Sequence, residues 1–229
     1  MRMSALSATT EVPVATIKYY LREGLLARGD LSAPNQAAYG EAHVRRLRLI
    51  RALIEVGGIG IAGARSVLAA IDSDMPTEQT FGIAQLTVSE QIDPADLDPN
   101  FLDRVDTALE GWHVSPQNPG RLAAARALMA ISAAGQDDLR GWVRRYTEAA
   151  LLVASADLDE VDAREDRQEK AELVVVGTAL GDALFSGLRR AAQEHVSAER
   201  YFQGTAARTD GPSNATSAAS SHRDSQEES

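Results

Sequence analysis

The spacing of helix-breaking residues in the first 24 positions constrains the fold more than any other feature of the chain. Short segments with helical apolar periodicity, at 4–10 and 14–23, are separated by Val12-Pro13, and Gly24 follows the second. Proline suits the first position of a helix and glycine the end of one. The spacing therefore predicts two short helices joined by a tight turn, the pattern of a helix-turn-helix.

The next 47 residues predict a small hairpin and two further helices. Segment 25–39 is short and rich in turn residues, which indicates a β-hairpin or wing. Apolar residues at helical spacing predict a helix over 40–56, ended by Gly57-Gly58, and another over 61–71.

Beyond a boundary at 72–76 the chain is expected to be entirely helical, which makes the fold class all-α with one small β wing. Helices are predicted over 77–91, 99–112, 119–134, 137–156 and 166–202. The expected domains are an N-terminal winged helix-turn-helix at 1–72 and a helical effector or dimerisation bundle at 77–203. The polar segment 204–229 is expected to be a disordered tail.

Composition excludes several classes of site. The 229 residues include no cysteine, which removes disulfides, thiolate metal ligands and cysteine nucleophiles. No run approaches the 18 or so consecutive apolar residues of a membrane span, and we expect a cytoplasmic protein without membrane contact. Neither a glycine-rich phosphate loop nor a hydrolase or zinc-protease motif occurs. We therefore expect no enzymatic activity and no cofactor.

Charge is distributed unevenly along the chain. The net charge is −10, but residues 1–71 carry nine Lys and Arg against five Asp and Glu, a balance of +4 that leaves −14 for the remainder. Phosphate contact needs a local basic face rather than a basic protein. The acidic total is therefore compatible with nucleic-acid binding by the first domain.

The segment 14–23 has two different faces when drawn as a helix. Val14, Ile17, Tyr20, Leu21 and Gly24 share an arc and should pack inward. The opposite arc is short, polar and basic, and it holds Ala15, Thr16, Lys18, Tyr19, Arg22 and Glu23. Such a surface can present donors to base edges and phosphates, although an ordinary solvated helix face would look the same.

The order of motifs from Met3 to Ile71 resembles the DNA-binding domain of the MerR family of bacterial transcription regulators. The resemblance rests on Met3-Ser-Ala-Leu-Ser7, then on Val12-Pro-Val-Ala-Thr-Ile-Lys-Tyr-Tyr-Leu-Arg-Glu-Gly-Leu-Leu26. It continues through Tyr39-Gly-Glu-Ala-His-Val-Arg-Arg-Leu-Arg-Leu-Ile-Arg51.

The resemblance implies a set of DNA contacts. The major-groove helix would contribute Thr16, Lys18, Tyr19 and Arg22, and the wing would contribute Asn35, Gln36 and Tyr39. The usual wing ends in Gly-Tyr-Arg-x-Tyr, whereas this one reads Asn35-Gln-Ala-Ala-Tyr39. The customary tyrosine and arginine are therefore missing. The affinity of the wing for DNA is either lower or supplied by Arg28 and Arg46. Arg45 is either a further contact or surface charge.

The resemblance also implies a homodimer on an inverted-repeat operator in a promoter, where it acts on RNA polymerase. Residues 77–91 are one candidate for the dimer contact, although they lack a sustained heptad pattern. The last helix is the other candidate. Its apolar stripe either is plain core or also builds the dimer contact, and it consists of Val176, Leu180, Leu184, Leu188 and Ala191.

The helical bundle is expected to bind a small apolar effector. Its candidate walls are Trp112, Trp142, Tyr146 and Phe185, which would otherwise be plain core. Neither His113 nor His195 has the paired spacing of a metal site, and the acidic run 157–166 is interpreted as a solvated helix start. The alternative function is a small-molecule-binding or sequestering protein in which DNA binding is secondary.

Overall fold

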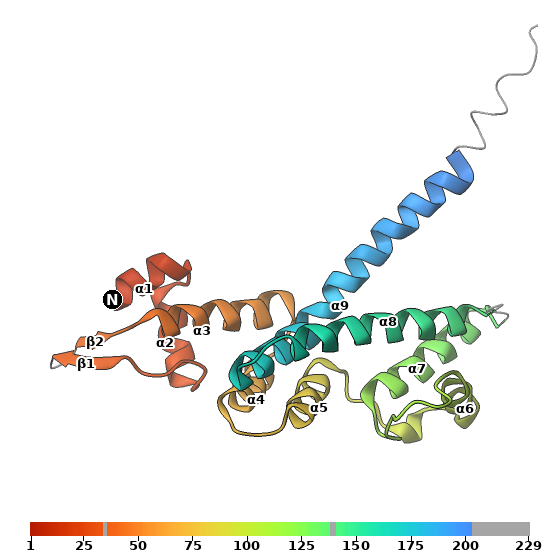
Figure 1. Ribbon diagram of the computed structural model, residues 1–229, viewed down its shortest axis with the longest axis horizontal. Helices are drawn as coiled ribbons and strands as arrows, with labels where there is room; N and C mark the ends of the chain where they lie inside the picture. The colour runs from red at the N-terminus through yellow and green to blue at the C-terminus, as the bar shows by residue number, and fades with distance from the viewer. Residues whose placement is uncertain (34–35, 138–140, 203–229) are drawn as a thin grey trace, which may run out of the picture. The chain divides into compact units, whose positions relative to one another are not determined.

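A computed structural model describes residues 1–33, 36–137 and 141–202 (Figure 1). The described part is mostly helical with one two-stranded sheet, which confirms the predicted fold class. The elements are α1 (Met3–Thr10), α2 (Val14–Arg22), β1 (Asp30–Ala33), β2 (Gln36–Ala38), α3 (Glu41–Arg51), η1 (Ala52–Val56), α4 (Ile61–Asp72), α5 (Thr77–Val88), η2 (Pro94–Asp96), α6 (Pro99–Ala108), α7 (Pro119–Ala133), α8 (Trp142–Asp162), α9 (Arg167–Ser197) and η3 (Ala198–Phe202). The tail predicted at 204–229 lies outside the described residues.

The chain divides into two compact units, Met1–Phe185 and Ser186–Ser229. The first unit holds two hydrophobic clusters. One joins α1–α5 with the first half of α9, and the other joins α6 and α7 with the start of α8. In the second unit, residues 186–202 continue the helix and are mostly exposed.

The α1–α2 pair forms as its sequence predicts. The turn at Val12-Pro13 is closed by Ser7, whose hydroxyl donates to the Val12 carbonyl at 2.6 Å. Gly24 ends α2 at φ +75°, a left-handed conformation that suits glycine. Leu6 and Ile17 are completely buried and pack this pair into the first cluster.

The predicted wing is an antiparallel hairpin of β1 and β2. Asp30 pairs with Ala38 and Leu31 with Ala37, and the register shifts between Leu31 and Ala33. Close packing at the base of the hairpin requires Gly29, because a Cβ there would lie 2.5 Å from the Ala38 carbonyl oxygen.

The α4–α5 pair also depends on a glycine. A Cβ at Gly63 would lie 2.6 Å from Thr87 Cγ2 and 2.8 Å from Ile59 Cγ2. The absent side chain lets the two helices approach closely, and Thr80 and Ala84 of α5 are buried in this packing.

The α6–α7 pair begins at two capped helix starts. Asp98 and Asn118 accept hydrogen bonds from backbone amides of the first turns, and each precedes a proline at the first helical position, as predicted. Arg121 joins the helices, because its guanidinium donates to both carboxylate oxygens of Asp106, at 2.5 and 2.6 Å, and to the Pro116 carbonyl at 2.9 Å.

The predicted boundary in the acidic run was wrong. The helix expected at 137–156 runs from 142 to 162, and the first four acidic residues of the run lie in its last turns. Val161 is buried there, and burial of this apolar residue holds the helix end despite the unfavourable charges. Only Asp166 behaves as a helix start, since its carboxylate accepts from the Glu169 amide at 2.9 Å.

Helix α9 packs against the first cluster. Ala171, Val175 and Ala179 are buried there, and a Cβ at Gly57 would lie 3.3 Å from Ala179. With η3, α9 is the one helix in the described ranges whose length and composition would suffice to cross a membrane, with a mean hydropathy of 1.5 in its most apolar window. The buried residues show that the first half of α9 serves here as a core helix.

Candidate nucleic-acid interface

The outer face of α2 carries most of the predicted DNA contacts. Ala15, Lys18 and Arg22 are exposed, and Thr16 and Tyr19 are half-buried. On the opposite face Ile17 is completely buried and Tyr20 nearly so. Burial raises the pKa of the Tyr20 hydroxyl, with the Glu55 carboxylate adding to the effect, so Tyr20 stays neutral. The structure thus confirms the inward positions of Ile17 and Tyr20, whereas Val14 and Leu21 are half-buried and Gly24 is exposed, so its predicted inward position was wrong.

Two side chains of the outer face lie against each other. The Arg22 guanidinium carbon is 5.1 Å from the centre of the Tyr19 ring, within the range of a cation–π contact. The carboxylate oxygen Oε1 of Glu23 lies 3.6 Å from the Arg22 Nε. The cation–π contact orients the Arg22 guanidinium at the end of α2, and most of the Arg22 side chain remains in solvent.

Arginines from other elements hold the end of α2 and the end of α1. Arg65 of α4 donates to the Glu23 carbonyl at 2.9 Å and pairs with the Glu23 carboxylate at 3.0 Å. Arg51 of α3 donates to the Thr10 carbonyl at 3.1 Å, just before the turn. These contacts hold the α1–α2 pair in place, which favours contacts of defined geometry at the outer face of α2.

The wing residues differ in what the structure shows of them. Asn35 lies outside the described residues, as does the Gln36 side chain. Tyr39 is only 6 % exposed and packs edge-on against His43, with ring centres 5.1 Å apart. Its backbone amide donates to the Met1 carbonyl at 2.8 Å. The Tyr39 ring is therefore part of the core, and we leave it out of the interface proposed below.

Arg46 is engaged within the protein. It forms an ion pair with Asp72 at the end of α4 and is mostly buried. Its neighbour Arg45 is exposed, as is Arg28, and neither has a carboxylate within ion-pair distance among the described residues. These two arginines are therefore better placed than Arg46 to meet a phosphate.

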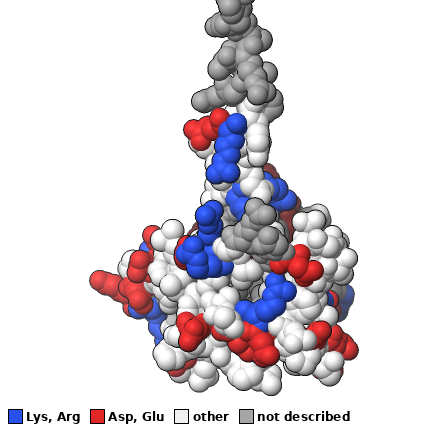
Figure 2. Space-filling model, turned by 90° about the vertical axis from the view of Figure 1, so that its right-hand side faces the viewer, with Lys and Arg blue, Asp and Glu red and all other residues white. Residues whose placement is uncertain are grey.

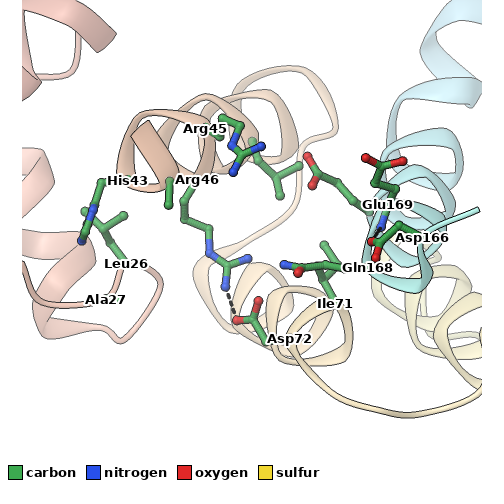
Figure 3. Close-up of a pocket in the computed structure, with 13 residues that line it drawn as sticks. Leu26, Ala27, His43, Arg45, Arg46, Ile71, Asp72, Asp166, Gln168 and Glu169 are labelled. Atoms are coloured by element: carbon green, nitrogen blue, oxygen red, sulfur yellow. Dashed lines mark hydrogen bonds and ion pairs between the residues drawn. The ribbon is translucent and has the colours of Figure 1, made fainter. Parts of the chain in front are cut away.

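A cavity of about 380 Å³ lies beside α3 (Figure 3). Arg45 and Arg46 stand on one side, and Asp166 and Glu169 at the start of α9 on the other. Arg167 follows directly and joins the same region, since it donates to the Ser73 carbonyl and pairs with Asp74 at 2.7 Å. The acidic residues Asp166 and Glu169 at the start of α9 thus lie next to arginines of α3.

The four predicted effector residues do not meet in one place. Trp112 lines a groove among α6, α7 and α8, whereas Trp142 and Tyr146 stack edge-on at 5.0 Å and are exposed. Phe185 is exposed on α9. The prediction missed other lining residues, Arg104, Leu128, Val143 and Leu151 among them.

Charges elsewhere on the molecule are mixed. On the face drawn in Figure 2, basic and acidic side chains are interspersed. No group of three or more His, Asp or Glu in the described ranges could hold a metal ion. In the described structure, the outer face of α2 combines basic, hydroxyl and small side chains on one helix.

Comparison with known proteins decides the family. The sequence model of the "MerR HTH family regulatory protein" group matches residues 1–71. A solved structure described as the "putative transcriptional regulator SCO5550 from Streptomyces coelicolor A3(2)" is 35 % identical, with a TM-score of 0.64. The match covers 88 % of this chain and 98 % of that one. The chain belongs to the MerR HTH family.

The MerR match spans every element from α1 to α3 and nearly all of α4, so it contains every predicted DNA-contact residue. The Streptomyces structure extends the likeness into the helical region of this MerR protein. No curated protein matches the chain. The likeness that spans most of the chain is to a protein described as a transcriptional regulator.

Proposed function

We propose that this MerR-family chain is a homodimeric, sequence-specific DNA-binding transcription regulator. Helix α2 of each copy enters the major groove at one half-site of an inverted repeat in a promoter, where RNA polymerase also binds. The observation that carries the proposal is the exposed face of Ala15, Lys18 and Arg22 on a helix whose end is held by Arg65. Short and basic side chains there can approach bases and phosphates together.

Homodimer formation is supported by apolar side chains that the first unit leaves uncovered. Leu152 on α8 is 73 % exposed and Leu184 on α9 is 65 % exposed. Helix α8 has 21 residues and a single buried one. A helix with so little packing gains stability from a partner. By contrast, α5, the other candidate for the dimer contact, uses Thr80 and Ala84 to pack within its own chain.

Control by a small molecule is supported by the packing of α9 on the DNA-binding elements. Arg167 pairs with Asp74, and Ala179 lies close to Gly57. A ligand-induced movement of α9 would therefore act directly on the residues that follow α4 and η1. A ligand can shift DNA affinity only by its differential affinity for the two states of such a contact.

The alternative is a small-molecule-binding or sequestering protein with a secondary DNA-binding role. The burial of Tyr39 and the pairing of Arg46 with Asp72 favour it, because both reduce the number of wing and backbone contacts available to DNA. The two functions differ in whether a defined operator exists.

Selection of bound fragments from genomic DNA separates the two functions. The full chain should enrich fragments that share an inverted repeat with half-site centres about 34 Å apart or a multiple of that. The variant Lys18→Ala/Arg22→Ala, with both changes on the exposed face of α2, should enrich none. If the unmodified chain yields no shared repeat at moderate salt, the regulator proposal is overturned in favour of the alternative.

A further inference from the structure

A groove of about 570 Å³ lies among α6, α7 and α8, and all of its lining residues are described. Its volume falls within the range of about 300–1,000 Å³ that small-molecule sites occupy. None of the DNA-contact residues takes part in it. The chemistry of its lining decides what it can hold.

The floor and walls of the groove are apolar. Leu128 of α7 is buried in the second hydrophobic cluster, and Val143 of α8 packs against the same cluster. Trp112 forms one wall, and Leu151 lies half-exposed at the other. These side chains would cover the body of an aromatic or aliphatic molecule.

The two threonines of the lining offer little to a ligand. The Thr107 hydroxyl donates to the Asp103 carbonyl at 2.8 Å, and the Thr147 hydroxyl donates to the Val143 carbonyl at 3.0 Å. Both hydroxyl protons are used within their own helices. These two hydroxyls therefore have no proton left to donate to a ligand, and their oxygens can only accept.

The arginines of the lining leave one positive charge uncompensated. Arg144 pairs with Glu148 four residues on, which makes that pair neutral. Arg104 has no carboxylate within ion-pair distance among the described residues, and its guanidinium lies 5.1 Å from the centre of the Phe101 ring. The groove thus combines an apolar interior with a single free guanidinium, which can take a carboxylate in bidentate geometry.

We propose that the groove binds a small monocarboxylic acid with an aromatic or aliphatic body. The body covers Trp112 and Leu128, and the carboxylate meets Arg104. The proposal rests on the proposed function in one respect. If the chain is a regulator, the carboxylic acid is the effector that controls its DNA binding. The binding itself requires no DNA.

Trp112 allows the binding to be measured directly in the full chain. Trp142 is the one other tryptophan of the sequence, so Trp142→Phe leaves Trp112 as the reporter. Titration with 3-phenylpropanoate and with octanoate should change Trp112 emission saturably at micromolar to millimolar concentrations. The matching primary amides and amines should bind at least about tenfold more weakly.

A charge-removing variant tests the role of Arg104. Arg104→Met should weaken carboxylate binding at least about tenfold and leave amide binding unchanged. Arg145→Met is the matched control on the same bundle, because Arg145 is exposed on α8 and does not line the groove. Equal affinity for acid, amide and amine, or an Arg104→Met variant that binds like the unmodified chain, would overturn the proposal.

Two further outcomes are distinguishable. If a second copy of the chain fills the groove, Leu151→Asp should convert a dimer to a monomer and no carboxylate should titrate, which overturns the ligand site. If genomic selection finds no operator but carboxylates still bind through Arg104, the regulator proposal fails and the site stands.

Discussion

Lys18 stands on the exposed side of α2, one helical turn before Arg22, and carries its charge into solvent. As a phosphate contact it would release counterions when DNA binds. Lys18→Ala should therefore weaken binding to all duplexes and lower the slope of log affinity against log salt by about one unit. Fluorescence anisotropy of a labelled duplex across a range of salt concentrations measures both quantities.

Lys170→Ala is the matched control for Lys18. Lys170 is the chain's other lysine and lies on α9. Its replacement should leave the salt slope unchanged. A Lys18→Ala variant with the slope of the unmodified chain would remove Lys18 from the set of phosphate contacts.

The buried Tyr39 ring gives a second prediction at this scale. Tyr39→Ala should lower the free energy of unfolding by about 3–5 kcal/mol, because it opens a cavity beside His43 and α3. Tyr39→Phe keeps the ring and should retain the DNA affinity of the unmodified chain. Urea denaturation and anisotropy check the two effects. A tenfold loss of affinity in Tyr39→Phe would instead place the hydroxyl on DNA.

The local sequence pattern predicts the burial of some of these side chains and not of others. The inward positions of Ile17 and Tyr20 follow from helical periodicity alone, and the structure confirms them. The burial of Tyr39 and the ion pair of Arg46 with Asp72 depend on packing between elements distant in sequence. No local signal distinguishes such a residue from a surface contact.

At the scale of elements, two glycines in the α4–α5 pair should respond in opposite ways to the same change. Gly63→Ala would place a Cβ 2.6 Å from Thr87 Cγ2 and should destabilise the protein by about 1–3 kcal/mol. Gly82→Ala, within α5, meets nothing within 4 Å and should stabilise by up to about 1 kcal/mol.

Thermal and urea denaturation of both glycine variants test the packing of α4 on α5. Loss of stability in both would mean that the Gly82 site is more crowded than its geometry indicates. A neutral Gly63→Ala would contradict the close approach of the two helices.

Helix existence was easier to predict than helix ends. Pro99 and Pro119 mark the starts of α6 and α7 because proline and the preceding side-chain cap act locally. The end of α8 at Asp162 depends instead on burial of Val161, a tertiary effect that outweighs the repulsion of the acidic run. The groove lined by Arg104 and Leu151 likewise arises only when α6, α7 and α8 pack together.

At the scale of the whole molecule, the proposed function predicts a dimer held together by exposed apolar side chains. The double variant Leu152→Glu/Leu184→Glu places charges on two of the most exposed leucines of the first unit. It should shift the protein from dimer to monomer without unfolding it, because charged groups are costly to bury in an apolar contact. Sedimentation velocity and circular dichroism measure the two properties.

Leu31→Glu is the control for the dimer. Leu31 is 83 % exposed, but it lies in β1 of the wing, so its replacement should leave the dimer intact. A double variant that sediments like the unmodified dimer would exclude α8 and this part of α9 from the contact.

The most direct test of the account places a DNA-cleaving reagent on α2. The chain has no cysteine, so Ala15→Cys creates a single attachment point for an iron chelate on the outer face. On the selected operator, cleavage should fall at two positions related by the symmetry of the inverted repeat, one in each half-site. The same reagent at exposed Ala154 of α8, attached through Ala154→Cys, should give no cleavage inside the half-sites. Absence of cleavage from position 15, or equal cleavage from both positions, would contradict the assignment of α2 as the DNA-reading helix.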